Sequence, residues 1–141
     1  NTIPIAMDGT YKFNQLGLHA VTSPMWETQE AFARTLKKGD VFFAISASGA
    51  SKRLIRMAKI VKKQGGVTVA VTNQAKSPIT EICDHVIITA TREHVFYDQV
   101  SFTRMAAMAV IDTLFMLILS MKNDFFENVA EHERSVIEEK L

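Results

Sequence analysis

Three short apolar runs, separated by polar and helical segments, stand out in the middle of the chain. VFFAI at 41–45, VTVAVT at 67–72 and HVIIT at 85–89 are rich in β-branched and aromatic residues and contain no acidic residue, lysine or arginine. Such runs are typical of strands that are buried on both faces of a parallel sheet. A further short strand is predicted for HAVTS at 19–23.

Helical periodicity fills the intervals between these runs. The helices that it predicts cover residues 4–16, 25–38, 52–63 and 77–84, and run from about residue 99 almost to the C-terminus with a break near Asn123-Asp124. Gly9 costs the first helix about 1 kcal/mol of propensity, which indicates close packing there. Ser23 and Pro24 are expected to be the cap and the first residue of the second helix. The alternation predicts an α/β protein: a flavodoxin-like, three-layer α/β/α sandwich with a parallel sheet.

The turn after the first of these runs is rich in hydroxyl groups, because residues 44–53 read AISASGASKR. Ligands of parallel sheets bind at the carboxyl ends of the strands, where this turn is expected to lie. A helix that begins near Ser51 leaves its first N–H groups unpaired and partially positive, which favours an anion. Ser46 and Ser48 add hydroxyl donors, and Gly49 lets the backbone approach closely. The turn therefore predicts a phosphate site.

Other interpretations of this turn were weighed against its composition. Serine and glycine are ordinary turn residues and one serine is an ordinary helix cap, so a turn without a ligand stays open as an alternative. The turn lacks the Lys-Ser/Thr pair of nucleotide-hydrolysing loops and the G-x-G-x-x-G of dinucleotide-binding loops. The pattern favours a small phosphorylated molecule, held by hydroxyls and amides without a metal.

The stretch from residue 39 to residue 89 resembles the core of a sugar isomerase (SIS) domain. In that family an apolar strand is followed by S-x-S-G-x-[ST], a helix ending in Gly, a strand ending in Thr, and Ser-Pro with an acidic residue before the next strand. The matching positions are Ser46, Ser48, Gly49, Ser51, Gly65 or Gly66, Thr72, Ser77, Pro78 and Asp84. The resemblance implies a phosphosugar bound between the strand ends, with the serine turn on its phosphate.

The later stretch SFTRMAAMAVIDTLFMLIL is similar to the end of the SIS domain in RpiR-type bacterial transcription regulators. There a hydroxyl-Arg pair precedes a long helix that contains Ile-Asp, and Thr103-Arg104 and Ile111-Asp112 match these positions. The resemblance implies a sensor that binds a phosphosugar and reaches DNA only through an N-terminal helix-turn-helix. A cytoplasmic location is expected for such a regulator.

The resemblance, which spans roughly residues 5–121, also predicts how the chain is organised. A single SIS-type domain is expected over residues 1–141, with residues 123–141 as a C-terminal helix. The family's first strand, its glycine-serine loop and a helix-turn-helix are expected upstream of Asn1, so the chain is expected to be an excised effector domain. The predicted phosphosugar-binding residues are Ser46, Ser48, Gly49, Ala50, Ser51, Glu93 and Thr103.

Some SIS domains isomerise or cleave sugar phosphates, using a carboxylate or imidazole to move a proton. Glu93 and His94, after the last predicted strand, are the candidates for such a role. We favour the interpretation that both are solvated loop residues. Alternatively, Glu93 forms hydrogen bonds with sugar hydroxyls. Thr103 and Arg104 face the ligand in one interpretation and are a helix cap and a surface cation in the other. No catalytic residue is therefore expected, and an isomerase or lyase is kept as the alternative to a sensor.

Metal and redox chemistry find little support in the sequence. His19, His85 and His132 are scattered, and with one cysteine they form no metal-ligand spacing, so neither a metal nor a cofactor is expected. Cys83 is interpreted as a structural thiol, and a lone cysteine fits a reducing cytosol.

Charge is unevenly distributed along a chain whose net charge is +1. Residues 1–70 carry a net +6 and residues 71–141 a net −5. The basic face of the helix at 52–63 has no interleaved aromatic residues, so a solvated face is favoured over nucleic-acid binding. Proximity to DNA or to a partner domain in an intact regulator is the alternative.

The most hydrophobic stretch, residues 105–121, has the length of a membrane span but contains Asp112. An ionised carboxylate at the centre of a bilayer costs roughly 3 kcal/mol, so a buried helix of a soluble protein is favoured. Because the helix from about 99 to 122 has no polar stripe, it is expected to contact a second copy in a homodimer or higher oligomer.

Overall fold

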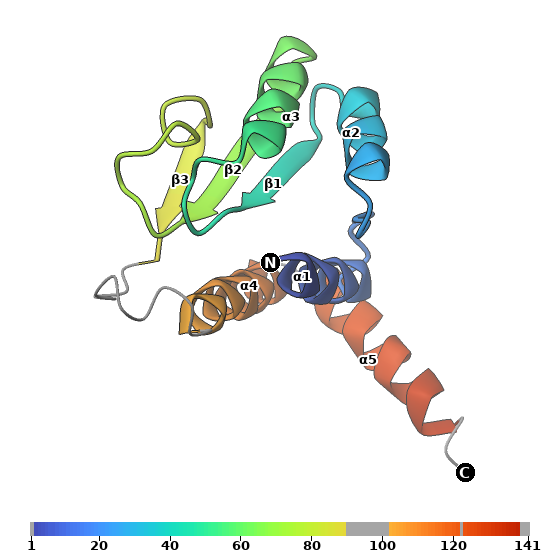
Figure 1. Ribbon diagram of the computed structural model, residues 1–141. Coiled ribbons are helices and arrows are strands. Elements are labelled where there is room, and N and C mark those ends of the chain that lie inside the picture. Colours follow the sequence, from blue (N-terminus) through green and yellow to red (C-terminus); the bar gives the residue numbers. More distant parts are fainter. Residues whose placement is uncertain (1, 90–101, 122, 139–141) are drawn as a thin grey trace.

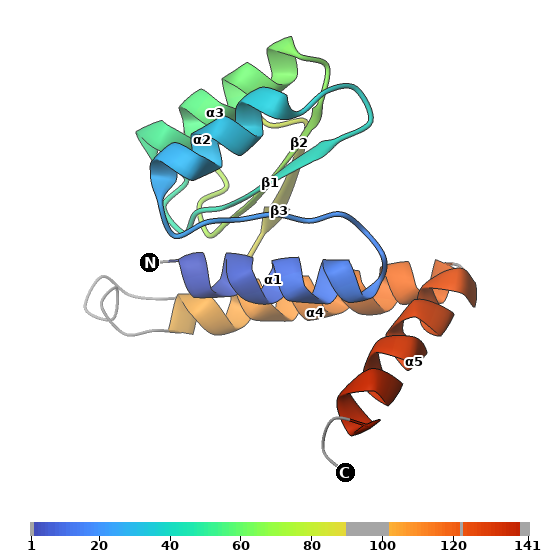
Figure 2. The same cartoon turned by 90° about the vertical axis from the view of Figure 1, so that its right-hand side faces the viewer.

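The computed structural model describes residues 2–89, 102–121 and 123–138. The helices are α1 (Ile3–Gln15), α2 (Trp26–Thr35), α3 (Lys52–Lys63), α4 (Phe102–Met121) and α5 (Asn123–Glu138), and the strands are β1 (Val41–Ile45), β2 (Val67–Thr72) and β3 (His85–Ile88). The three strands form a parallel sheet in the order β1-β2-β3. α2 and α3 lie over one face of the sheet, and α1 and α4 lie over the other (Figures 1 and 2). The predicted α/β sandwich with a parallel sheet is confirmed.

Alternating residues of the strands face the two helical layers. Ile45 and Val71 pack with Ile5 of α1 and with Ala107 and Ile111 of α4. The neighbouring alanines of β1 and β2, Ala44 and Ala70, point to the opposite face and pack with Ile79. The sheet is thus covered on both faces, as its unbroken apolar strands require.

α1 packs closely against α4 on one side of the sheet. A Cβ built on Gly9 would lie 3.1 Å from Cδ1 of Ile111, so the close packing predicted at this glycine is confirmed. The Lys12 ammonium lies between two carboxylates, at 2.8 Å from Asp8 Oδ2 and in contact with Asp112 Oδ1. These hydrogen bonds raise the pKa of Lys12, that to Asp112 most strongly. The carboxylate of α4 therefore pairs with α1.

The strand predicted at 19–23 is wrong, because this segment is an extended connection outside the sheet. The side chain of Asn14 pairs with both backbone groups of Ala20: Nδ2 donates to Ala20 O at 3.0 Å, and Ala20 N donates to Oδ1 at 2.9 Å. The end of α1 thus fixes this residue of the connection. Figure 2 shows the connection running between α1 and α2.

Two predicted helix details are also wrong. α2 begins at Trp26, and Ser23 Oγ accepts from Met25 N at 3.1 Å, which closes a turn ahead of the helix instead of capping it. Residues 77–84 form turns and no helix. The backbone bonds of this segment are mostly of the tighter i→i+3 kind, with Thr80 N donating to Ser77 O at 3.0 Å and Ile82 N to Ile79 O at 3.2 Å, so it forms successive turns.

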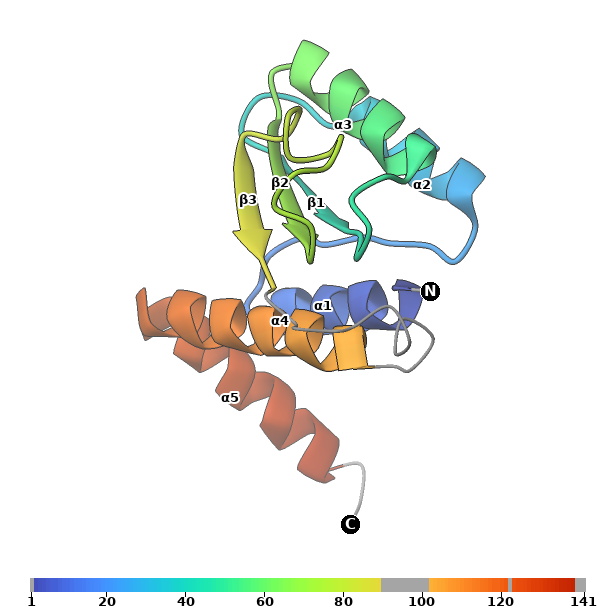
Figure 3. The same cartoon turned by 60° about the vertical axis from the view of Figure 1, so that its left-hand side comes forward.

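The long C-terminal helical region is broken between α4 and α5, as predicted near Asn123. α5 leaves the end of α4 and projects away from the sheet (Figures 1 and 3). Among the described residues, Arg104–Met121 is the one window that passes a test of length and apolar composition for membrane spans, and 11% of it is buried. In this structure α4 forms a layer of the sandwich, and its outward face is uncovered.

Candidate functional site

The serine turn (residues 46–51) connects the carboxyl end of β1 to the amino end of α3. Ser46 N donates to Val71 O at 2.9 Å, which extends the pairing of β1 with β2 by one residue. Gly49 N then donates to Ser46 O at 3.1 Å and closes the turn. Ser51 is the N-cap of α3, and its Oγ accepts from Leu54 N at 3.5 Å. The predicted strand, turn and helix start are all confirmed.

Gly49 is required by a contact within the protein. Its φ is 63°, and a Cβ at this position would lie 2.1 Å from Ser77 Oγ and 3.0 Å from Thr72 Oγ1. Its carbonyl accepts from Ile79 N at 3.0 Å. The missing side chain thus lets the serine turn pack against the turn that follows β2, which fixes the position of both.

The three hydroxyl groups of the turn differ in their surroundings. Ser46 is 7% exposed, and its hydroxyl forms no hydrogen bond with another described residue. Ser48 is exposed, and its Oγ accepts from Ala50 N at 3.3 Å. Because Ser48 and Ser51 use their oxygen atoms only as acceptors in these bonds, their O–H groups remain able to donate to an anion. Ala50 is exposed beside them.

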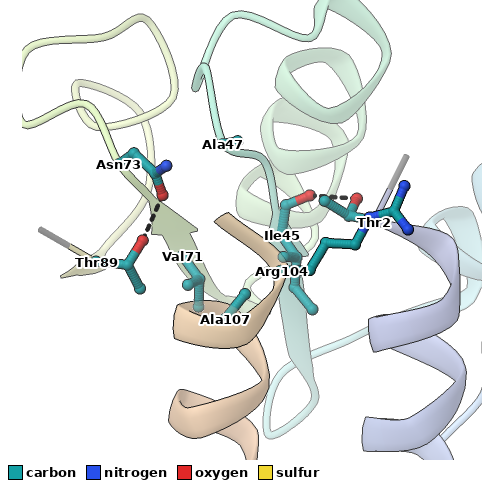
Figure 4. A pocket seen from close by; sticks show the side chains of 8 residues that line it. All are labelled: Thr2, Ile45, Ala47, Val71, Asn73, Thr89, Arg104 and Ala107. Carbon is teal, nitrogen blue, oxygen red and sulfur yellow. Dashed lines mark hydrogen bonds between the residues drawn. The ribbon is translucent and has the colours of Figure 1, made fainter. Parts of the chain in front are cut away.

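A small cavity opens where the carboxyl ends of the strands meet the amino ends of α1 and α4 (Figure 4). It is lined by Thr2, Ile45, Ala47, Val71, Asn73, Thr89, Arg104 and Ala107. Ala47 is the member of the serine turn that reaches it. Its volume is about 70 Å³, which is less than the ~300 Å³ at which ligand pockets begin.

Four polar groups surround this cavity: Thr2, Asn73 and Thr89, which sequence analysis missed, and Arg104, for which it gave contact with the ligand as one of two interpretations. Asn73 follows β2 directly, its N–H donates to Ala47 O at 3.1 Å, and its Oδ1 accepts from Thr89 Oγ1. Thr89 follows β3, and Thr2 Oγ1 donates to Ile45 O at 2.9 Å. Arg104 extends from α4 beside Thr2 (Figure 4). Asn73 and Thr89 could have been proposed from the sequence, because each is the first polar residue after its strand.

The described part of the structure does not place the other predicted site residues at this cavity. Glu93 and His94 lie outside the described residues. Thr103 lies in the first turn of α4, and its side chain is outside the described part. Within residues 2–89, 102–121 and 123–138, no group of three His, Cys, Asp or Glu side chains is placed to hold a metal ion.

Two of the groups with shifted pKa values lie at the opposite end of the sheet, away from the cavity. The ion pair with Lys62 at 2.8 Å and the hydrogen bonds from Thr68 hold the pKa of Asp84 well below its usual range. Burial raises the pKa of the Cys83 thiol, which agrees with a structural cysteine. These groups tie α3, β2 and β3 together.

Comparisons with known proteins agree with this geometry. The SIS domain family matches residues 2–117. An uncharacterized HTH-type transcriptional regulator of Caldanaerobacter subterraneus is 32% identical over 131 residues, which are 90% of this chain and 46% of that protein. The chain thus spans about half the length of this curated relative.

Solved structures show the same fold. The NanR protein of Vibrio vulnificus, complexed with ManNAc-6P, matches with a TM-score of 0.85 at 22% identity, over 95% of this chain and 51% of NanR. The sugar isomerase domain of an RpiR transcription factor from Sphaerobacter thermophilus matches with a TM-score of 0.71 at 20% identity, over 93% and 72%. Other matching structures are described as candidate sugar-phosphate or phosphosugar isomerases.

The family match covers most of the chain, and the strand–turn–helix that carries the family's serine motif is present in the structure. The fold is shared with NanR and with the sugar isomerase domain of an RpiR transcription factor. The chain is therefore a member of the SIS domain family.

Proposed function

We propose that the chain is the phosphosugar-binding effector domain of an RpiR-type transcription regulator of the cytoplasm. The observation that carries the proposal is the cavity at the carboxyl ends of the strands, bordered by the serine turn through Ala47. The phosphate is bound by the N–H groups at the start of α3 and by the hydroxyls of Ser46, Ser48 and Ser51. The sugar extends toward Asn73, Thr89 and Arg104.

The similarity to regulators supports a sensor. The curated relative that covers 90% of this chain is an HTH-type transcriptional regulator, and NanR is complexed with a phosphorylated amino sugar. A phosphosugar regulates such a protein only by binding two of its arrangements with different affinity. The cavity is suited to this, because residues of β1, β2 and α4 line it together with the residues that precede α1 and follow β3, so a ligand there contacts several elements at once.

Calorimetric titration with a panel of phosphosugars, ManNAc-6P among them, tests the proposal. Ser48→Ala removes one hydroxyl donor to the phosphate and is expected to weaken binding about 10- to 150-fold, the effect of a hydrogen bond of roughly 1.5–3 kcal/mol to a charged group. Ser120→Ala is the matched control, because Ser120 is an exposed serine of α4 that bonds only to Leu117 O. Equal affinity in the Ser48 variant and the wild type would contradict the assigned site.

An isomerase is the second candidate function, because similar solved structures are described as candidate isomerases. It requires a proton-transferring group, for which the sequence offers Glu93. Turnover of aldose phosphates by the wild type, lost in Glu93→Gln, would replace the sensor by an enzyme. We expect no turnover in either protein.

A further inference from the structure

The outward face of α3 carries a line of cations. A shallow hollow on this face is lined by Lys52, Arg56, Lys59 and Lys63 and by two apolar residues, Ile55 and Ile60. No acidic residue takes part in this lining. The hollow and the ligand cavity belong to different layers, since α3 lies on the other face of the sheet from α1 and α4 (Figure 2).

Some cations of α3 have partners within the protein. Arg56 pairs with Glu30 at 3.0 Å, and Lys62 pairs with Asp84 at 2.8 Å. Arg53 stacks on the ring of Trp26, with its guanidinium carbon 4.8 Å from the ring centroid.

The remaining three lysines are unpaired. Lys52, Lys59 and Lys63 form no ion pair or hydrogen bond with another described residue. Their spacing of seven and four residues places them along one side of the helix, about 16 Å from first to last at 1.5 Å per residue. An exposed line of like charges repels itself, so a polyanion bound along it is stabilised.

We infer that this basic ridge (Lys52, Lys59 and Lys63 of α3) contacts the phosphate backbone of duplex DNA. A duplex carries one negative charge per about 1.7 Å of its axis when both strands are counted, and one per about 3.4 Å along each strand. A 16 Å ridge therefore runs past about five phosphates of one strand. The curated relative is an HTH-type regulator, which places such a domain in a DNA-binding protein. The ridge adds a sequence-independent contact to the sequence-reading contact expected of a helix-turn-helix.

An acidic protein surface is the competing partner, and this chain contains one. Exposed acidic residues of α5 are Asp124, Glu127, Glu131 and Glu133. Four charges over ten residues of helix are one per about 3.4 Å, which equals the phosphate spacing along one DNA strand, but Arg134 lies next to them and lowers their net charge, whereas every unit of a DNA strand is anionic. The observations therefore favour DNA over the α5 of a second copy.

The test is fluorescence anisotropy of a labelled duplex of arbitrary sequence, titrated with the 141-residue chain at several salt concentrations. The test variant is Lys59→Gln/Lys63→Gln, and Lys52 is left in place because it adjoins Ser51 of the serine turn. The matched control is Lys37→Gln/Lys38→Gln, an exposed pair in the turn before β1 with the same change of charge. Equal phosphosugar affinity and melting temperature in all three proteins establish that the fold is kept.

For three phosphate contacts, binding to DNA is expected to weaken about 40-fold between 50 and 200 mM salt, with a log–log slope near −2.7. Removing two contacts reduces that slope to about −0.9 and the loss to about fourfold, whereas the control keeps the wild-type slope. The inference is overturned if the wild type does not bind DNA at 50 mM salt, or if both double variants change the slope equally. It is also overturned if Lys59→Gln/Lys63→Gln leaves DNA binding intact and abolishes self-association in sedimentation. None of these outcomes bears on phosphosugar binding, because Lys59 and Lys63 lie about two to three turns along α3 from Ser51 and the serine turn.

Discussion

Gly49 and Ser77 approach each other so closely that a Cβ on the glycine would lie 2.1 Å from the serine hydroxyl. The two residues belong to different turns, one after β1 and the other after β2. Ser77 is 7% exposed, and its hydroxyl donates to Gln74 O at 3.2 Å, so it has little room to move. The serine turn is therefore held in place by the neighbouring turn before any ligand binds.

Gly49→Ala is expected to destabilise the protein strongly. A left-handed φ of 63° costs an L-residue about 1–2 kcal/mol, and the overlap with Ser77 adds about 1–3 kcal/mol. Urea denaturation should therefore show a free energy of unfolding that is lower by about 2–5 kcal/mol.

Gly39→Ala is the control for backbone strain, because Gly39 has a φ of 97° but no atom within 4 Å of the added Cβ. A second variant, Gly49→Ala/Ser77→Gly, removes the overlap and should recover part of the lost stability. If Gly49→Ala and Gly39→Ala cost the same and the double variant recovers nothing, the contact with Ser77 does not position the turn.

The elements that sequence analysis predicted correctly are those whose signal is local. β1, β2 and α3 follow from unbroken apolar runs, from an amphipathic pattern and from Ser51 as a cap. The strand predicted at 19–23 failed because the segment joins no sheet and Ala20 pairs instead with the side chain of Asn14, a partner that no local pattern reveals. The helix predicted at 77–84 failed because its backbone closes i→i+3 turns, which the same local pattern of apolar and polar residues also allows.

The candidate site also has a part that could be predicted from local sequence and a part that could not. The serine turn is one contiguous motif, so its position after β1 could be predicted from the sequence. Thr2, Asn73, Thr89 and Arg104 come from four separate parts of the chain, and only the fold brings them around one cavity. Predicting such a set requires the order of the strands and the packing of α1 on α4, which are properties of the whole chain.

The ion pair between Lys62 and Asp84 predicts a pH dependence of stability. The pKa of Asp84 is held below its usual range by Lys62 first and by the hydrogen bonds from Thr68 second. A carboxyl with a depressed pKa stabilises the fold above its unfolded pKa, about 3.9, and this contribution is lost as the pH falls toward the folded pKa. The free energy of unfolding should therefore fall below about pH 5 more steeply in the wild type than in Asp84→Asn.

Urea denaturation at a series of acidic pH values measures this difference. The amide introduced by Asp84→Asn keeps an oxygen that can accept from Thr68, so the substitution isolates the charge. Glu81→Gln is the matched control, because Glu81 is exposed and forms no ion pair with a described residue. Parallel pH profiles for the wild type and Asp84→Asn would show that the ion pair with Lys62 does not contribute.

The uncovered face of α4 predicts a second copy of the chain. Its exposed apolar side chains are Met105, Met108, Met116, Leu117 and Met121. Burying such side chains is worth about 1.5–3 kcal/mol each, and methionine adapts readily to an opposing surface. We expect the wild type to sediment as a dimer and Met116→Glu/Leu117→Glu to sediment as a monomer, because the variant places two carboxylates in the buried interface.

The control for this prediction is Val21→Glu/Met25→Glu. These side chains are 51% and 61% exposed, close to the 61% and 55% of Met116 and Leu117, but they lie on the connection that leads to α2. The control therefore adds the same charge at similarly exposed apolar positions and should stay dimeric. If both double variants dissociate equally, the added charge and not the position on α4 is responsible. A wild type that sediments as a monomer would contradict the prediction. It would show that the outward face of α4, with its four methionines and one leucine, stays exposed to solvent.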